Sequence, residues 1–195
     1  MRSQINGLNQ AVNNADDAIG LIQTAEGAMT ETHSMLQRMK TLTTQAANGT
    51  YTKTARDNIQ AEVEALNKEI TRIASTTKFN GETPLSPAKK GQNLTFFIGA
   101  TADKTNAMTV EQQNMTAAAL TIDKIKVDTT TDAFKAMASV DAAIERVSTY
   151  RATLGAAQNR LEHTVNNLKV TSENITSAES RIRDTDMADE ITAYT

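Results

Sequence analysis

The residues able to hold a metal or move a proton are few and widely spaced in this 195-residue chain. The two histidines are His33 and His163, and neither stands in the His-Glu-x-x-His pattern that places two zinc ligands on one helix face. The chain has no cysteine, which excludes disulfides, thiolate metal sites and cysteine nucleophiles. We therefore predict that the protein is not an enzyme, and that it has no catalytic site, no metal site and no cofactor.

Four acidic side chains gather near the C-terminus, at Asp184, Asp186, Asp189 and Glu190. They lack the glycine and the final glutamate that a calcium-binding loop carries at fixed positions. We interpret this cluster as a solvated helix end, or as a contact to a further segment of the protein.

Gln37, Arg38 and Leu42 form the most informative group of side chains. Arg38 and Leu42 are four residues apart, so on a helix they share one face. An exposed arginine beside an exposed leucine has the composition of an interaction hot spot. The alternative is that Leu42 belongs to the core and Arg38 is an ordinary solvated charge, and the pattern alone favours this alternative.

A first helix must position this group. Apolar residues recur every three or four positions along it, with Thr32 filling one turn and a change of phase by one residue expected after Ile22. The predicted core positions are Ile5, Leu8, Val12, Ala15, Ile19, Ile22, Ala25, Met29, Leu36, Met39 and Leu42. We expect Asn48-Gly49 to end the helix with left-handed backbone.

A second and a third helix are predicted further along. Thr54 and Asp57 resemble a capping box, and the short linker makes the first two helices antiparallel neighbours. After a cap at Thr131-Asp132, a stripe without proline predicts one helix to the C-terminus. The expected core positions are Ile59, Val63, Leu66, Ile70 and Ile73 in the second helix, and Phe134, Met137, Val140, Ile144, Val147, Leu154, Leu161, Val165, Leu168, Ile175 and Ile182 in the third.

The segment between these helices is rich in β-formers. Residues 93–98 and 107–110 predict two strands, joined by a loop at residues 99–106. The fold class we predict is mainly α: an elongated bundle of three long helices with a small β-hairpin region at one end. Aromatic residues are only 4% of the chain, which favours helices packed through aliphatic side chains.

Composition also excludes some partners. The net charge of −3 argues against a nucleic-acid binder. No stretch approaches the roughly 20 apolar residues of a membrane span, so no membrane partner is expected.

Two sets of motifs carry a family resemblance. The first comprises LIQTAEGAM at 21–29, LQRM at 36–39 and QAANGT at 45–50. The second comprises LGAAQNRLEHT at 154–164, SEN at 172–174 and AESRIRDTDMA at 178–188. In this order, separated by a variable middle, they resemble the N- and C-terminal regions of bacterial flagellins over residues 1–80 and 134–195.

The resemblance implies a structural subunit of the bacterial flagellar filament, extracellular, with other flagellin subunits as partners. It further implies that residues 1–195 are one rod domain (D1), with N-terminal helices at 1–80, the hairpin and loops at 82–131 and the long C-terminal helix at 132–195. The terminal D0 segments and the outer D2 and D3 domains of the family would be absent. A chain of that kind is expected to be monomeric and not to polymerise when seeded.

The resemblance also implies a second partner, Toll-like receptor 5. In flagellins that this receptor recognises, the matching segment contributes Gln37, Arg38 and Leu42, and a glutamate on the next helix maps to Glu62. The turn that holds Asn48, Gly49 and Thr50 would be clasped by a receptor loop. Thr41 stands where many recognised flagellins have an acidic residue. The same surface is thought to contact a neighbouring subunit in the filament, so the receptor would bind monomers.

Two alternatives remain open from the sequence. A hook–filament junction protein shares the terminal helical regions. A coiled-coil adaptor or secreted effector would have the helices without any role in assembly.

Overall fold

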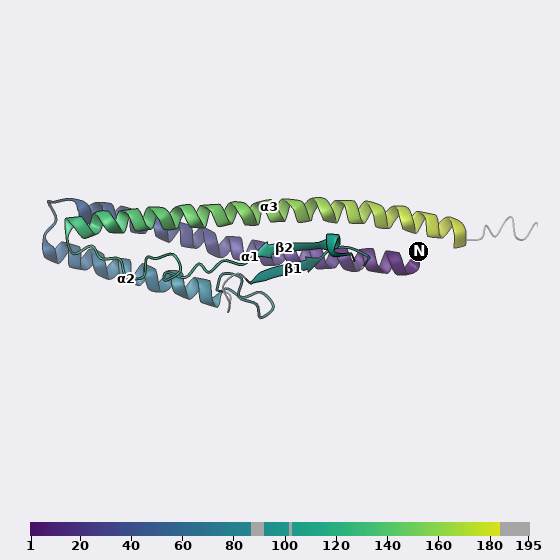
Figure 1. Cartoon of the computed structure of the whole chain (residues 1–195), viewed down its shortest axis with the longest axis horizontal. Helices are drawn as coiled ribbons and strands as arrows, with labels where there is room; N and C mark the ends of the chain where they lie inside the picture. Colours follow the sequence, from purple (N-terminus) through teal and green to yellow (C-terminus); the bar gives the residue numbers. More distant parts are fainter. Residues whose placement is uncertain (87–91, 102, 184–195) are drawn as a thin grey trace, which may run out of the picture. The chain divides into compact units, whose positions relative to one another are not determined.

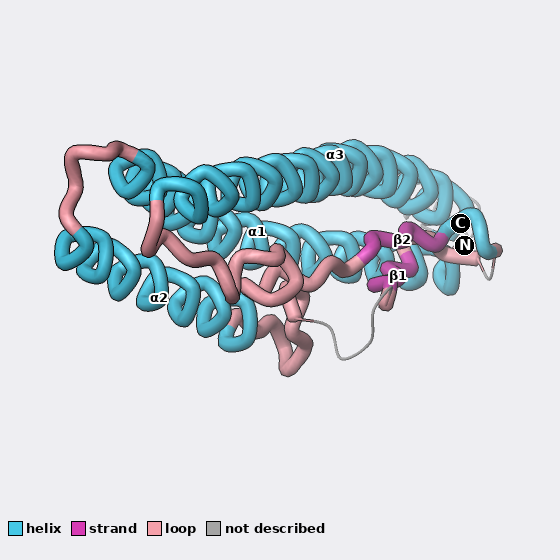
Figure 2. The backbone as a smooth tube through the Cα atoms, turned by 60° about the vertical axis from the view of Figure 1, so that its left-hand side comes forward, coloured by secondary structure: helices cyan, strands magenta, loops and turns pink. Residues whose placement is uncertain are grey.

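The computed structural model describes residues 1–86, 92–101 and 103–183 (Figure 1). Its helices are α1 (Arg2–Ala47), α2 (Lys53–Thr76) and α3 (Thr130–Arg183). Strands β1 (Asn93–Phe97) and β2 (Ala107–Glu111) pair in a two-stranded antiparallel sheet, with a short 3-10 helix at Lys104–Asn106. Three helices and one small hairpin confirm the predicted fold class (Figure 2). None of the described helices is long and apolar enough to cross a membrane.

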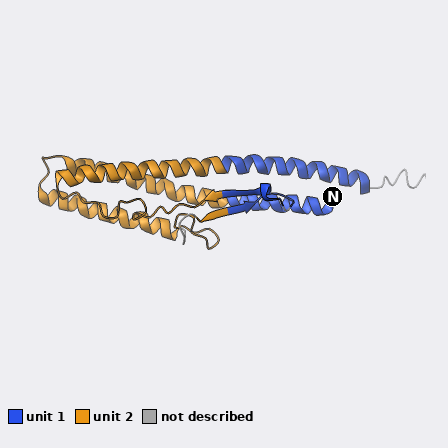
Figure 3. Ribbon diagram, viewed as in Figure 1, with its two compact units in different colours: residues 1–19, 95–109, 158–195 blue, residues 20–94, 110–157 orange. Residues whose placement is uncertain are grey.

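The chain forms two compact units (Figure 3). Unit 1 contains Met1–Ile19, Thr95–Thr109 and Gln158–Thr195, and unit 2 contains Gly20–Leu94 and Val110–Ala157. Helices α1 and α3 contribute to both units. The candidate interaction residues predicted from the sequence all belong to unit 2.

Along its main seam, α1 buries side chains that are alternately three and four residues apart, without interruption. The buried positions are Leu8, Ala11, Ala15, Ala18, Ile22, Ala25, Met29, Thr32, Leu36, Met39, Thr43 and Ala46. This is the seven-residue repeat typical of coiled-coil packing. The predicted change of phase after Ile22 is therefore wrong, since Ala11 and Ala18 are buried while Val12 and Ile19 are only half-buried.

Helix α3 repeats this arrangement. Its buried positions are Ala133, Ala136, Val140, Ala143, Val147, Tyr150, Leu154, Ala157, Leu161, Val165 and Leu168. Phe134, predicted to lie in the core, is 62% exposed, and Met137 and Ile144 are half-buried because alanines occupy the inward positions. The predicted core residue Ile182 is 74% exposed. The predicted extension of this helix to residue 195 lies outside the described residues.

Helix α3 begins at Thr130, so its N-cap lies two residues before the predicted Thr131. Thr129 Oγ1 accepts a hydrogen bond from Asp132 N at 3.1 Å and donates one to Asp132 Oδ2 at 2.7 Å. The bond to Thr129 is the main reason that the pKa of the Asp132 carboxyl is lowered. The hydroxyl of Thr129 thus satisfies a backbone N–H of the first turn, and the N-cap is Thr129 rather than Thr131.

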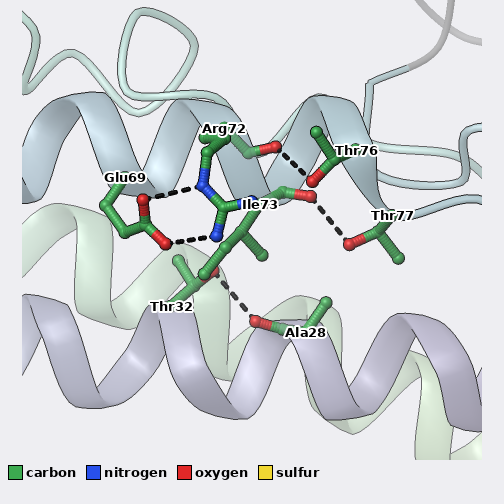
Figure 4. Close-up of polar contacts among 7 residues, drawn as sticks. All are labelled: Ala28, Thr32, Glu69, Arg72, Ile73, Thr76 and Thr77. Carbon is green, nitrogen blue, oxygen red and sulfur yellow. Dashed lines mark hydrogen bonds and ion pairs between the residues drawn. The ribbon is translucent and has the colours of Figure 1, made fainter.

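Helix α2 also differs in detail from the prediction. Its N-cap is Thr52, whose hydroxyl accepts from Ala55 N at 3.3 Å, rather than Thr54. The buried positions are Ile59, Val63, Asn67, Ile70 and Ala74, which leaves Leu66 and Ile73 half-buried. At its C-terminal end the hydroxyls of Thr76 and Thr77 donate to the carbonyls of Arg72 and Ile73 (Figure 4).

Residues 112–128, which we call the strap, complete the core of unit 2 without regular secondary structure. Met115, Leu120, Ile122 and Val127 on the strap are each at most 1% exposed. Side chains from the helices hold its backbone, because an extended segment without a paired strand leaves its own peptide groups unsatisfied.

Three side chains of α2 form most of these hydrogen bonds to the strap. Gln60 donates to Ile125 O at 3.3 Å and accepts from Val127 N at 2.9 Å, so its amide stands in for a neighbouring peptide group. Asn67 Nδ2 donates to Ile122 O at 2.8 Å, and Thr71 Oγ1 accepts from Ala117 N at 3.3 Å. From α3, Arg146 Nη1 donates to Ala119 O.

In unit 1 the hairpin rests on α1. Asn14 Nδ2 donates to Phe97 O at 2.9 Å, and a Cβ atom on Gly7 would lie 3.2 Å from Ala100 Cβ. At the hairpin tip, a Cβ atom on Gly99 would lie 2.2 Å from Asn106 Cγ, so only glycine fits there. Both strands and the loop thus lie close to where the sequence predicts them.

Candidate interaction surface

Arg38 and Glu62 are brought together by the packing of α1 on α2 in unit 2. Arg38 Nε donates to Glu62 Oε1 at 2.7 Å, and the two side chains are 55% and 42% exposed. The hydrogen bond to Glu62, followed by the charge of Glu62, holds the pKa of the Arg38 guanidinium above its usual value. An exposed pair of this kind adds little to stability. Its effect is to fix the orientation of both side chains at the surface.

The pair leaves hydrogen-bonding groups available. Arg38 uses only Nε, so within residues 1–86, 92–101 and 103–183 its two Nη groups have no partner, and neither has Glu62 Oε2. A guanidinium edge with free Nη groups can bind a carboxylate through two parallel hydrogen bonds. The arrangement therefore suits recognition of a partner protein.

Gln37 lies beside Arg38 and is also exposed. Its Nε2 atom is 2.9 Å from His33 Nε2, one helical turn earlier. His33 itself is half-buried, and its Nδ1 is buried without a partner among the described residues. The contact with His33 restricts the orientation of the Gln37 amide.

Leu42 does not belong to this surface. It is 2% exposed, next to the buried positions Thr43 and Ala46 of α1. The hypothesis that Arg38 and Leu42 form an exposed pair is therefore wrong for the leucine, and the alternative that Leu42 is a core residue is confirmed. The physical reason is that α1 buries a second column of side chains beside its main seam, to which Leu21 also belongs.

The turn between α1 and α2 presents Asn48, Gly49 and Thr50, all of which are exposed. Neither Asn48 nor Gly49 has a positive φ, so the predicted left-handed end of the helix is wrong. Asn48 Oδ1 instead accepts from Thr50 N at 3.2 Å, and Tyr51 N donates to Asn48 O at 3.3 Å.

Arg56 closes this turn and was not singled out by the sequence. Its Nε donates to Ala46 O at 3.0 Å and its Nη2 to Asn48 O at 3.2 Å. A cation at the carboxyl end of a helix satisfies unpaired carbonyls and complements the helix dipole. The only signal in the sequence was a basic residue one turn after a short linker, which is too common to be informative.

The remaining candidate residues do not gather into a site. His163 is exposed on α3. Among the described residues, no three His, Asp or Glu side chains come together as a metal-binding group. The acidic cluster of Asp184, Asp186, Asp189 and Glu190 lies outside the described residues.

Comparison with known proteins identifies the family. Residues 1–90 match the model of the bacterial flagellin N-terminal helical region, and residues 137–195 match that of the C-terminal helical region. All of the chain aligns with 74% of a flagellin from Bacillus subtilis at 45% identity. The chain belongs to the bacterial flagellins. Flagellin FlaB2 of Treponema pallidum is 44% identical over 72% of its own length.

Solved structures agree with this assignment. The crystal structure of Bacillus cereus flagellin superposes with a TM-score of 0.71 at 30% identity, covering 86% of this chain and 94% of that one. A putative flagellar hook-associated protein from Vibrio parahaemolyticus shares the fold at 14% identity, with a TM-score of 0.70. At that identity the likeness shows the fold alone, so the flagellin matches outweigh the hook–filament alternative.

Flagellin membership makes the chain a structural protein of the flagellar filament and not an enzyme. The motifs at 21–50 and 154–188 thus led to the correct family. Because a filament subunit acts through its surfaces, the group around Arg38 is a candidate for contact with other proteins.

Replacing Arg56 by alanine should lower the free energy of unfolding by about 1–2 kcal/mol, because two carbonyls at the end of α1 lose a charged donor. Arg72→Ala is the matched control. Arg72 pairs with Glu69 on the exposed side of α2 (Figure 4), and its loss should leave the free energy of unfolding nearly unchanged. Urea unfolding followed by circular dichroism measures both. Equal effects of the two substitutions would contradict the role assigned to Arg56.

Proposed function

We propose that this flagellin acts outside the cell, where copies pack side by side through the outer faces of their helices to form the filament that transmits motor torque. What supports this is the distribution of polar residues along α1. Its seam positions are filled within the chain, and the positions between them carry exposed, hydrogen-bonding side chains such as Gln37, Arg38 and Thr41. Surfaces of that composition suit contacts that form and are rearranged during assembly.

We further propose that the free subunit is a ligand of Toll-like receptor 5. The contact surface would comprise Gln37, Arg38 and Glu62, together with Asn48, Gly49 and Thr50 of the turn. The observation that carries this proposal is the Arg38–Glu62 pair, since two residues expected from the family to bind the receptor are bonded to each other and exposed. Leu42 supports α1 from beneath and does not touch the receptor.

Receptor binding and filament packing would compete for this surface, so the receptor binds the monomer.

Exposed large apolar side chains of the described residues are Met1, Phe97, Phe134, Val170 and Ile182. They lie on separate elements or at least 12 residues apart on α3, too dispersed to drive stable self-association. A monomer in dilute solution is the state that we propose.

The assembly function is tested by a chimaera in which this chain replaces the matching region of the Bacillus subtilis flagellin, in a strain that lacks its own flagellin. We expect filaments by electron microscopy and restored swimming, since the chain aligns over its whole length with that relative. A chimaera that is exported and folded but forms no filament would contradict a filament role for these residues.

The receptor function is tested by Arg38→Ala. We expect binding to the receptor ectodomain to weaken by about 2 kcal/mol, or roughly thirtyfold, as for a central arginine in an interface. Arg72→Ala is again the control, because Arg72 also forms an exposed ion pair on these helices and should leave affinity unchanged. Surface plasmon resonance measures both.

The substitution Leu42→Ala tests whether Leu42 acts in the core or at the receptor surface. It should cost about 2–5 kcal/mol of stability while the folded fraction binds the receptor normally. Equal affinity of Arg38→Ala and wild type would place the receptor surface elsewhere.

A further inference from the structure

A groove in unit 2 runs between α2 and the strap, and neither the filament proposal nor the receptor proposal uses it. Its volume is about 680 Å³. Asn67 and Lys68 of α2 line one side, and Lys124, Ile125 and Lys126 of the strap line the other. We call it the strap groove.

The walls of the groove are fixed in place. Gln60 holds Ile125 and Val127, and Asn67 holds Ile122, as described above. Thr121 precedes the lining residues of the strap and has φ of 62°, a left-handed conformation that a β-branched residue adopts only when its surroundings impose it. This turn allows the strap to present residues 123–126 at the groove.

The groove carries polar groups without partners. Asn67 is 7% exposed, and its Oδ1 atom is buried with no hydrogen bond to any part of the chain that the structure describes. A buried acceptor of this kind costs free energy unless a donor reaches it. Lys68, Lys124 and Lys126 are exposed, and none forms an ion pair or hydrogen bond within the described ranges.

The charge of the lining favours an acidic occupant. Glu64 and Asp123 also line the groove, so three lysines face two carboxylates. The lysines therefore outnumber the carboxylates of the lining by one charge. An acidic peptide in the groove could supply carboxylates to the exposed lysines.

We propose that the strap groove binds the acidic segment at residues 184–190 of a second copy of this chain. That segment has Asp184, Asp186, Asp189 and Glu190 and no basic residue, and no other stretch of the sequence has this charge density. The proposal rests on the filament function, because only an assembly holds copies at the concentration that a weak electrostatic contact requires.

The geometry of such a contact agrees with filament growth. The groove belongs to α2 and the strap, whereas the acidic segment follows α3, so the two surfaces are different and not self-complementary. Contacts between unlike surfaces can add copies in series, as the growth of a filament requires.

The test is fluorescence anisotropy with a labelled peptide of residues 184–193, titrated with the full chain at low salt. We expect saturable binding that weakens with added salt. Lys124→Glu combined with Lys126→Glu should weaken it about tenfold or more, since it reverses two charges of the groove. A peptide with Asp184→Lys and Asp186→Lys should then bind this variant better than it binds the wild type.

Lys78→Glu combined with Lys104→Glu is the matched control, because both lysines are exposed and lie outside the groove. Equal loss of binding in both double variants, or equal binding of a scrambled peptide, would show general charge attraction and overturn the proposal. No binding at millimolar peptide would overturn it too. If the chimaera forms filaments but the peptide does not bind, only the proposed contact is contradicted. If the peptide binds but the chimaera forms no filaments, the proposed assembly function is contradicted.

Discussion

A buried seam rich in alanine, on both α1 and α3, is the constraint on which the rest of the structure depends. Five of the twelve seam positions on α1 are alanine, at 11, 15, 18, 25 and 46, and two are threonine. Thr32 and Thr43 are buried because their hydroxyls donate to carbonyls of their own helix, at Ala28 and Lys40. Such a seam needs no large aromatic residues, which explains how 4% aromatic content suffices for a core. Within unit 2, Lys40–Asp141 at 2.7 Å and Glu26–Arg151 at 3.5 Å flank this seam.

The phase of that seam decides which side chains reach the surface. Because Leu36, Met39 and Thr43 point inward, Gln37 and Arg38 must point outward, and Arg38 meets Glu62 at the edge of α2. The same phase puts Leu42 inside. A filament subunit thus gains an exposed polar surface on a helix whose position is fixed by its buried face. Arg56 then determines where the helix ends and how the turn at residues 48–50 is presented.

The helices, the hairpin and the family could be predicted because long periodic stripes and extended motifs are strong signals. The errors in the core positions of α1 and α3 share one cause: alanines, which give a weak hydrophobic signal in a sequence, occupy buried positions beside larger apolar residues. Phe134 and Ile144 were assigned to the core in place of Ala133 and Ala143, and the apparent change of phase in α1 came from counting Val12 and Ile19 instead of Ala11 and Ala18. The strap could not be predicted, since its position depends on Gln60, Asn67 and Thr71, which are distant in sequence. The burial of Leu42 was favoured by the pattern of the sequence alone, whereas the family resemblance placed this residue on the receptor surface.

The central claim is that alanines hold seam positions of α1 and α3 in place of the larger apolar residues beside them. Comparing Ala143→Leu with Ala142→Leu by urea unfolding tests it most directly, since the two alanines are adjacent and only Ala143 is buried. Leucine at 143 should lower the free energy of unfolding by about 1–3 kcal/mol, because the extra atoms overfill a closely packed seam. Leucine at 142 should change it by less than about 0.5 kcal/mol, as at other exposed helix positions. If Ala143→Leu proved neutral or stabilising, the seam would not be closely packed there and the account would be contradicted.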